Sequence, residues 1–116
     1  MTTAQGEPQT TYNVFASVDM RVGRIVGAEP FPQARKPALR LTIDFGELGE
    51  KRSSAQVAHY EPASLIGRLV IAVVNFPPRQ IGPFMSEVLV LGVPDDTGRV
   101  ILLHPDDDVP LGGRVF

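Results

Sequence analysis

The residues of this chain that could act on a ligand are mostly cations. Arg35 and Lys36 are adjacent in a proline-rich segment, and Arg79 follows two prolines. Guanidinium and ammonium groups bind phosphates and carboxylates through charge-assisted hydrogen bonds. Together with Arg40 and Arg52, these side chains predict a surface that binds a polyanion or a polypeptide. The alternative is an ordinary charged surface without a ligand.

The segment that contains the two prolines also carries apolar and polar candidates. Phe76, Phe84 and Met85 lie there among prolines and glycines, and an exposed apolar segment of this kind often marks an interaction site. We expect these three side chains to form a pocket wall for apolar peptide side chains. Packing onto the barrel or onto a second subunit is the alternative. Asn75 and Ser86 frame the segment and could hydrogen-bond a ligand, although both could equally hold the chain in place.

No constellation of residues predicts catalysis, a metal or a cofactor. His59 and His104 are the only histidines, neither has a second ligand at metal spacing, and the chain has no cysteine. Ser53 and Ser54 have no neighbouring histidine or aspartate that could activate a nucleophile. The acidic run at residues 106–108 lacks the spaced ligands and the glycine of a calcium loop. We therefore expect a binding module that is not an enzyme.

The charge of the chain is unevenly distributed. Its formal net charge is −2 over 116 residues. Residues 20–86 contain nine basic and five acidic side chains, a balance of +4, whereas residues 87–116 contain two basic and six acidic side chains, a balance of −4. A polyanionic partner could therefore bind one face of a protein that is acidic as a whole.

The first residues and the composition predict a cytoplasmic protein. Residues 1–11 contain no lysine or arginine and no apolar stretch, so they lack the basic and apolar regions of a signal peptide. No run approaches the roughly 20 apolar residues that span a membrane, so we expect no membrane insertion. The absence of cysteine fits a reducing compartment. Residues 1–12 are expected to be a disordered leader.

Apolar periodicity predicts a chain dominated by short strands. Leu39, Leu41, Ile43 and Phe45 alternate with polar residues, which indicates a strand with one buried face. Continuous apolar runs further on predict strands that are buried on both faces. We expect strands at residues 20–28, 38–45, 51–57, 69–74, 88–93 and 99–103, and a short helix at residues 61–67.

Glycines, prolines and one asparagine predict where these elements bend or end. The alternation in the first strand slips at Gly23, which predicts a bulge or bend there. Three prolines in residues 76–83 predict a loop, because proline cannot donate to a strand ladder. Asn13 is expected to cap a short helical turn.

The order of these elements predicts an all-β oligonucleotide-binding barrel (OB-fold) at residues 13–116. This five-stranded barrel has a short helix between its third and fourth strands, with extra terminal elements here, and it binds ligands on strands two and three and the adjoining loops. The predicted ligand face includes Arg40, Thr42, Arg52, Ser54 and Gln56, with loops at residues 31–37 and 75–86. A β-sandwich is the alternative. The last three strands carry more apolar residues than one small barrel can bury, which predicts a homodimer.

Several segments resemble the tRNA-binding domain family and, within it, the CsaA group. The segments are residues 18–25, 31–39, 53–56, 73–79 and 86–92, and the resemblance extends from residue 14 to the end of the chain. It implies a homodimeric, export-related chaperone that binds unfolded or precursor polypeptides, with structure-specific tRNA binding as the alternative. The implied site is Asn75, Arg79 and Ser86, with Arg35, Lys36 and Arg40 nearby. Relatives that bind tRNA carry more lysines in these loops, so the resemblance favours a polypeptide.

Overall fold

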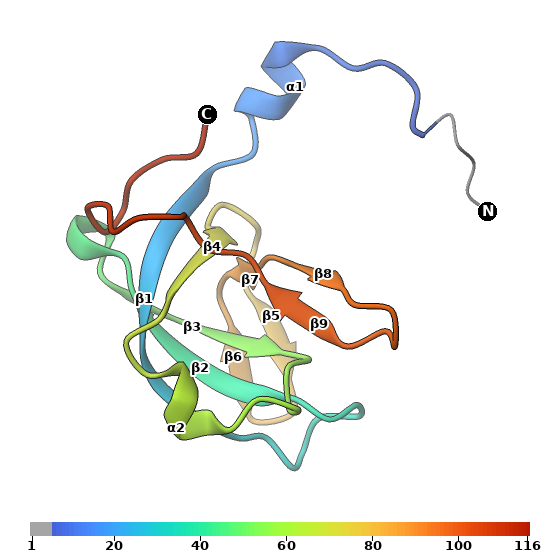
Figure 1. The fold of residues 1–116 in the computed structure, drawn as a ribbon, viewed down its shortest axis with the longest axis vertical. Coiled ribbons are helices and arrows are strands. Elements are labelled where there is room, and N and C mark those ends of the chain that lie inside the picture. Colours follow the sequence, from blue (N-terminus) through green and yellow to red (C-terminus); the bar gives the residue numbers. More distant parts are fainter. Residues whose placement is uncertain (1–5) are drawn as a thin grey trace.

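A five-stranded antiparallel sheet forms the body of the molecule (Figure 1). The computed structural model describes residues 6–116. The strand order is β3-β2-β1-β4-β7. The strands are β1 (Met20–Pro30), β2 (Leu39–Asp44), β3 (Glu50–Ala55), β4 (Leu69–Val73) and β7 (Leu89–Val90). The sheet curls until β3 contacts β7, so the barrel is nearly closed and the predicted OB-fold is confirmed.

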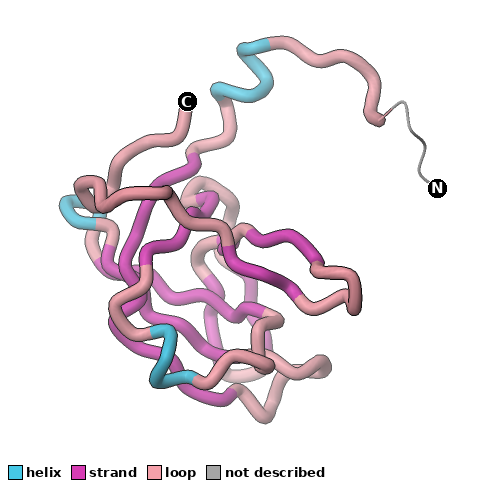
Figure 2. Tube along the Cα trace, in the orientation of Figure 1, coloured by secondary structure: helices cyan, strands magenta, loops and turns pink. Residues whose placement is uncertain are grey.

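Two hairpins and three short helical elements complete the fold. The hairpins pair β5 (Arg79–Ile81) with β6 (Phe84–Ser86), and β8 (Gly92–Pro94) with β9 (Val100–Leu102). The helix α2 (Pro62–Leu65) lies between β3 and β4, as the sequence predicts, and a 3-10 turn (Gly46–Leu48) joins β2 to β3. The helix α1 (Tyr12–Ala16) stands away from the barrel, and loops connect most of the short elements (Figure 2). No helix within residues 6–116 is long and apolar enough to cross a membrane.

The core is built from the alternating side chains of β2 and the strands around it. Leu39, Leu41, Ile43 and Phe45 are all at most 3% exposed, so the predicted alternation is confirmed. They pack with Ile25 and apolar residues of α2, β4 and β9 in one cluster. A second, smaller cluster joins Phe31, Ala38 and Phe84 outside the main core. That cluster connects the loop after β1 to the β5–β6 hairpin.

Four local predictions are corrected by the structure. The register shift in β1 falls between Ile25 and Gly27, and Gly23 stays in register with Val70 of β4, so the predicted bulge is not at Gly23. The glycine instead leaves space for the Ile43 and Phe45 side chains, which an added Cβ would meet at less than 3 Å. The helix α1 is capped by Thr11, whose hydroxyl accepts a hydrogen bond from the Val14 amide at 3.3 Å, and not by Asn13.

The other two corrections concern the predicted loop and the predicted buried strand. Residues 76–83 are not entirely loop, because β5 begins directly after the two prolines and Gly82 and Pro83 form the turn, where no ladder donor is needed. The predicted strand at 88–93 is two strands, and Leu89 and Val93 are 49% and 51% exposed. The chain leaves the sheet between them, so neither residue is buried on both sides.

Both ends of the described chain lie at the same end of the barrel (Figure 1). The C-terminal segment pairs with β1, since the Val22 amide donates to the Gly113 carbonyl at 2.9 Å and the Val115 amide donates to the Met20 carbonyl at 2.9 Å. The predicted leader lies partly outside the described residues. Residues 6–11 are exposed and belong to no helix or strand, and the division of the chain into a leader and one domain stays a prediction.

Asp95 closes the turn between β8 and β9, and this contact predicts a local pH dependence. Its carboxylate accepts hydrogen bonds from the Thr97 hydroxyl at 2.8 Å, the Thr97 amide at 2.9 Å and the Arg99 amide at 3.0 Å. The Thr97 hydroxyl, with the two amides and the Arg99 guanidinium, lowers the pKa of Asp95 from 3.8 to about 2. Because the pKa is lowered on folding, the turn gains its full stability above about pH 4 and loses it as the pH falls through 2.

We therefore expect Asp95→Asn to loosen the hairpin at neutral pH and to remove its acid dependence. Amide hydrogen exchange of residues 97–99 would measure this. Asp96→Asn is the matched control, because Asp96 takes part in no hydrogen bond or ion pair in the described chain. Equal exchange in the two variants would contradict the assigned role of Asp95.

Candidate functional site

A groove of about 520 Å³ lies beside the edges of β3 and β7, between the loop after β1 and the two hairpins. The last two residues of β3, Ser54 and Ala55, contribute to it together with Gln56, which follows the strand. Its aliphatic lining comes from β5, β7 and β9 and the residue after Gln56. These side chains are Val57, Ile81, Leu89, Val90, Val100 and Leu102.

Three of the predicted ligand-binding cations meet at this groove. Arg35 and Lys36 lie on the loop after β1, and Arg79 begins β5. All three are exposed, and no acidic residue of the described chain lines the groove. Within residues 6–116 none of the three forms an ion pair with a carboxylate. Their charges are therefore available to an anionic group of a ligand.

The two other predicted cations are engaged by contacts within the protein. Arg40 forms an ion pair with Glu29 at 2.9 Å, and its guanidinium lies 5.5 Å from the centre of the Phe31 ring. Arg52 lies over the Phe84 ring at 4.4 Å. Neither residue lines the groove, although their binding role stays a prediction. Aromatic faces attract cations in this geometry, which stabilises both arginines where they are.

The aromatic residue beneath Arg52 is buried instead of exposed. Phe84 is only 2% exposed, because its ring packs against Phe31 with 5.3 Å between ring centres. Its cluster packs against Ala34 and Ile81, which line the groove. For Phe84 the structure thus supports the alternative in which this segment packs onto the barrel. Phe76 and Met85 are 49% and 43% exposed, as an interaction surface requires, but they do not line the groove.

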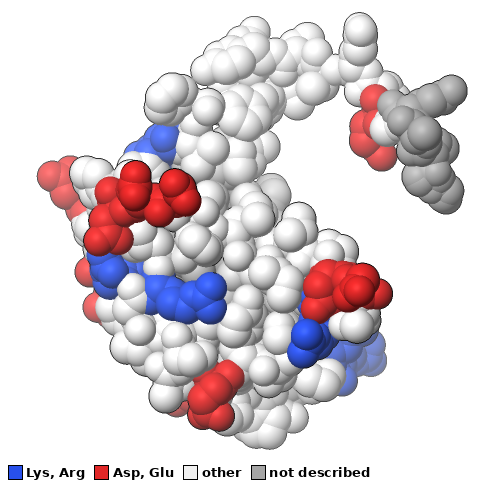
Figure 3. Space-filling model, in the orientation of Figure 1, with Lys and Arg blue, Asp and Glu red and all other residues white. Residues whose placement is uncertain are grey.

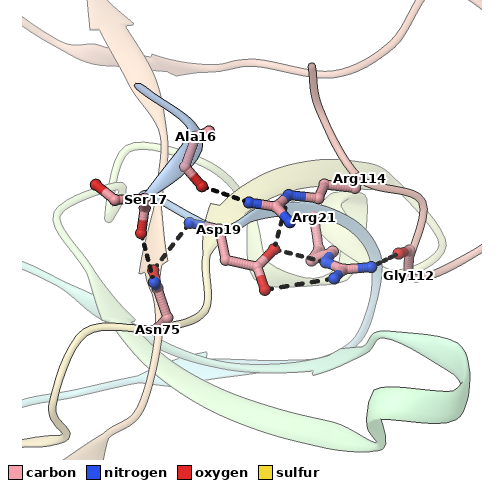
Figure 4. Close-up of polar contacts among 7 residues, drawn as sticks. All are labelled: Ala16, Ser17, Asp19, Arg21, Asn75, Gly112 and Arg114. Atoms are coloured by element: carbon pink, nitrogen blue, oxygen red, sulfur yellow. Dashed lines mark hydrogen bonds and ion pairs between the residues drawn. The ribbon is translucent and has the colours of Figure 1, made fainter. Parts of the chain in front are cut away.

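The two polar candidates of the segment hold the fold together. The Asn75 side chain accepts a hydrogen bond from the Asp19 amide at 2.9 Å and donates one to the Ser17 carbonyl at 2.8 Å (Figure 4). The Ser86 hydroxyl accepts one from the Ser54 amide at 3.0 Å. These bonds support the structural alternative for both residues, and ligand binding by either stays a prediction.

A polar network surrounds Asn75 and connects the segment that follows α1 to the C-terminal segment. Asp19 accepts a hydrogen bond from Arg21 at 2.6 Å and forms a longer ion pair with Arg114 at 3.7 Å. Arg114 in turn donates to the Ala16 carbonyl at 2.7 Å (Figure 4). The network thus joins α1, β1, the segment after β4 and the C-terminal segment, and none of its residues lines the groove.

Sequence reasoning missed the aliphatic half of the groove. The sequence predicts Leu89 and Val90 in a buried strand and Val100 and Leu102 in the last strand, and all four look like core residues. These side chains reach the groove because β3 and β7 separate beside them. This separation depends on the tertiary structure, so local sequence patterns do not reveal it. The alternation in β3 does place Ser54 and Gln56 together on the predicted ligand face, and both line the groove.

Other charged groups do not form a comparable site. Acidic and basic side chains lie in small neighbouring groups on the face drawn in Figure 3, and most of that face is uncharged. The acidic run at residues 106–108 lines a shallow pocket of about 260 Å³ with Arg68 and His104. Within the described residues no group of three His, Cys, Asp or Glu side chains could hold a metal.

Comparisons with known proteins agree with the fold and the resemblance. Residues 20–114 match the family described as "Putative tRNA binding domain". The chain is similar to the chaperone CsaA of Bacillus anthracis, with 47% identity and a TM-score of 0.88, over 94% of this chain and 100% of that chain. It is also similar to the CsaA chaperone protein of Picrophilus torridus, with 49% identity and a TM-score of 0.87, over 93% and 100% of the two chains.

A longer relative shows that this kind of domain also occurs within larger proteins. Methionine–tRNA ligase 1 of Sorangium cellulosum is 43% identical over 109 residues, which make up 93% of this chain and 15% of the ligase. The chain spans about 15–16% of the length of the curated relatives it matches first.

Proposed function

The chain belongs to the tRNA-binding domain family. From this premise, we propose that it is a chaperone similar to CsaA and that it binds unfolded or precursor polypeptides in the groove beside β3 and β7. The proposed protein is a binding module and not an enzyme, and it uses no cofactor. We place it in the cytoplasm with a link to protein export, in which the export machinery is a further partner.

The aliphatic lining of the groove is the observation that carries this proposal. Six branched aliphatic side chains and three alanines line it, and within the described residues no aromatic ring does. Proteins that bind single-stranded nucleic acids stack the bases on aromatic rings, and this groove offers none. Valine- and leucine-type side chains of an unfolded polypeptide would be removed from water there, which is favourable by roughly 25 cal/mol per Å² of apolar surface.

The predicted site residues divide into two groups in this proposal. Arg35, Lys36 and Arg79 contact the ligand directly from the rim. The others act from outside the groove: Arg40, Arg52, Asn75, Phe84 and Ser86 hold the loop and the hairpin in place, and Phe76 and Met85 extend the apolar surface for a longer polypeptide.

Structure-specific tRNA binding is the second candidate, and the same cations favour it. Three exposed cations, which have no acidic partner in the part of the chain that the structure describes, lie on two neighbouring elements. Basic side chains in such positions bind nucleic-acid phosphates with a strong dependence on salt. The family description points to the same ligand. Few cations are present, however, so the expected tRNA affinity is modest.

Fluorescence anisotropy with two labelled ligands tests the proposal. One ligand is reduced, carboxymethylated α-lactalbumin, which stays unfolded, and the other is bulk tRNA; each is titrated across a salt series and then used as competitor. We expect saturable binding of the unfolded protein that persists at high salt, because apolar contacts are not screened. If tRNA binds and the unfolded protein does not, the chaperone proposal is overturned and the tRNA function takes its place.

The proposed homodimer would cover the outer face of the β8–β9 hairpin. Val93 and Ile101 are cross-strand partners on this face and are 51% and 38% exposed, and Leu103 beside them is 37% exposed. Val100 and Leu102 point to the opposite face, toward the groove. A second copy could therefore bury the outer face and leave the groove open to a ligand.

We expect the Ile101→Asp chain to be monomeric in light scattering at concentrations where the parent chain is a dimer. The two-fold symmetry would bury an unpaired carboxylate twice in each dimer, and this cost destabilises the dimer relative to the monomer. Ile66→Asp is the matched control, because Ile66 is 50% exposed and lies at the end of α2, outside the β8–β9 hairpin. A dimer that survives Ile101→Asp would exclude this face.

A further inference from the structure

The edge strands β3 and β7 face each other across a gap that hydrogen bonds close at one end and that is open at the other. At the joined end the Glu87 amide donates to the Arg52 carbonyl at 2.7 Å, and the Ser53 hydroxyl donates to the Val88 carbonyl at 2.9 Å. After these contacts β3 and β7 separate, and they form no ladder with each other, since they are the two outer strands of the sheet. The groove lies beside the open end.

Backbone groups of both strands face this opening. Arg52 and Ser54 direct their backbone groups away from β2, as their bonds to residues 86 and 87 demonstrate. On β7, the Leu91 amide donates to the Ile71 carbonyl of β4 at 2.9 Å. Because neighbouring residues of a strand direct their backbone groups to opposite sides, the N–H and C=O of Val90 point away from β4 and toward β3.

The Ser54 carbonyl and the backbone groups of Val90 have no strong partner within residues 6–116, whereas the Ser54 N–H is already bonded to the Ser86 hydroxyl. The Ser54 carbonyl receives only a long contact of 3.5 Å from the Ser53 hydroxyl, and the Val90 N–H and C=O make no hydrogen bond on the β3 side. Exposed edge groups of this kind are a template for an additional strand. An extended peptide that joins such an edge gains main-chain hydrogen bonds, and pockets select its alternate side chains.

The chemistry of the groove indicates which side chains that strand would carry. Successive side chains of a strand point to opposite faces. One set would reach the aliphatic lining at Val57, Val100 and Leu102, and the other set would reach the rim, where three cations and no acidic residue lie. Charge complementarity therefore favours acidic residues at the alternate positions.

We propose that the ligand binds as an added β-strand at the open edge between β3 and β7, and that this strand alternates aliphatic with acidic residues. The inference rests on the proposed polypeptide-binding function and specifies its binding mode. It differs from recognition of any exposed apolar chain, because it requires the backbone of the ligand as well as its side chains.

A set of labelled octapeptides tests this inference on the full chain. The parent alternates valine and glutamate. In one derivative every valine is N-methylated, and in another every glutamate is, so each lacks the N–H donors along one edge of the strand. A fourth peptide has the same composition as the parent, but its valines are grouped together. We expect at least one N-methylated peptide to bind about tenfold more weakly, because each lost hydrogen bond weakens binding several-fold. The grouped peptide should also bind more weakly.

The outcomes separate this inference from the function on which it rests. If the parent and both N-methylated peptides bind equally well, strand addition is excluded while polypeptide binding stands. If neither the parent nor the unfolded protein used above binds, both proposals fail. If the unfolded protein binds but the parent peptide does not, only the inferred ligand pattern and mode are overturned.

Amide hydrogen exchange provides a second readout that needs no variant of the protein. Addition of the parent peptide should slow the exchange of the Val90 N–H, which faces the opening. The Leu91 N–H already donates to Ile71 and serves as the internal control. An unchanged Val90 rate at saturating peptide would overturn strand addition.

Discussion

Replacement of Arg35, Lys36 and Arg79 by alanine is expected to weaken ligand binding about 100-fold at low salt. Each cation is exposed at the rim of the groove and has no acidic partner within residues 6–116. A hydrogen bond to a charged group contributes about 1.5–3 kcal/mol before exposure to water reduces it. About 1 kcal/mol for each of three cations gives the expected factor. Anisotropy titrations of the unfolded protein and of tRNA from 50 to 300 mM salt would measure it.

The salt dependence of the same titrations distinguishes direct contacts between the three cations and the ligand from an effect of the protein's net charge. For tRNA, loss of three phosphate contacts should flatten the slope of log affinity against log salt by about two to three. The control chain replaces Arg24, Lys51 and Arg68, which lie outside the groove lining, with the same change in net charge. Equal losses in the two chains would mean that ligands sense only the overall charge and that the rim is not the site.

The strand pattern near the core could be predicted because it depends on local alternation. Leu39, Leu41 and Ile43 lie on one face of β2 in the sequence and in the structure. The pattern failed where apolar residues continue across a change of direction. Leu89 and Val93 belong to one apolar run, but the chain leaves the sheet between them, and no local signal marks that point.

The candidate site was predictable to the extent that the barrel topology determines it. Arg35 and Arg79 are 44 positions apart, and only the assignment of their segments to two loops at one end of an OB-fold suggests that they meet. The engagement of Arg40 and Arg52 could not be predicted. It depends on the packing of Phe31 against Phe84, two rings from distant segments that look like ordinary loop residues in the sequence.

The aromatic pair gives the two ligand-binding elements a common support. Phe31 begins the loop that carries Arg35 and Lys36, and Phe84 lies in the hairpin that carries Arg79. The pair is buried in a cluster separate from the main core. The rim cations are therefore held by their own small core, and the packing of Phe84 in this segment contributes to the site without contact with the ligand.

The Gly23→Ala chain is expected to be the least stable of the variants considered, with a loss of about 3 kcal/mol. An added Cβ at this position would lie 2.5 Å from the Cγ2 atom of Ile43 and 2.7 Å from the Cε1 atom of Phe45. Both side chains are fully buried, so they cannot move aside without disturbing the core, and overpacking of this kind typically costs about 1–3 kcal/mol. Urea unfolding would measure the loss, and thermal unfolding should show a decrease of roughly 10 °C or more.

Two comparisons separate overpacking at Gly23 from a general intolerance of β1 to substitution. Gly27→Ala is the milder control, because its Cβ would lie 3.3 Å from the Cβ atom of Thr42, which is only partly buried. In a Phe45→Leu background the ring atoms nearest to Gly23 are absent, so Gly23→Ala should be less damaging there, and a double-mutant cycle would measure this coupling. Strictly additive losses would show that the cost arises from the β1 backbone instead. Since Gly23 lies in β1 away from the groove lining, the fraction of the variant that remains folded should bind ligand with the parent affinity.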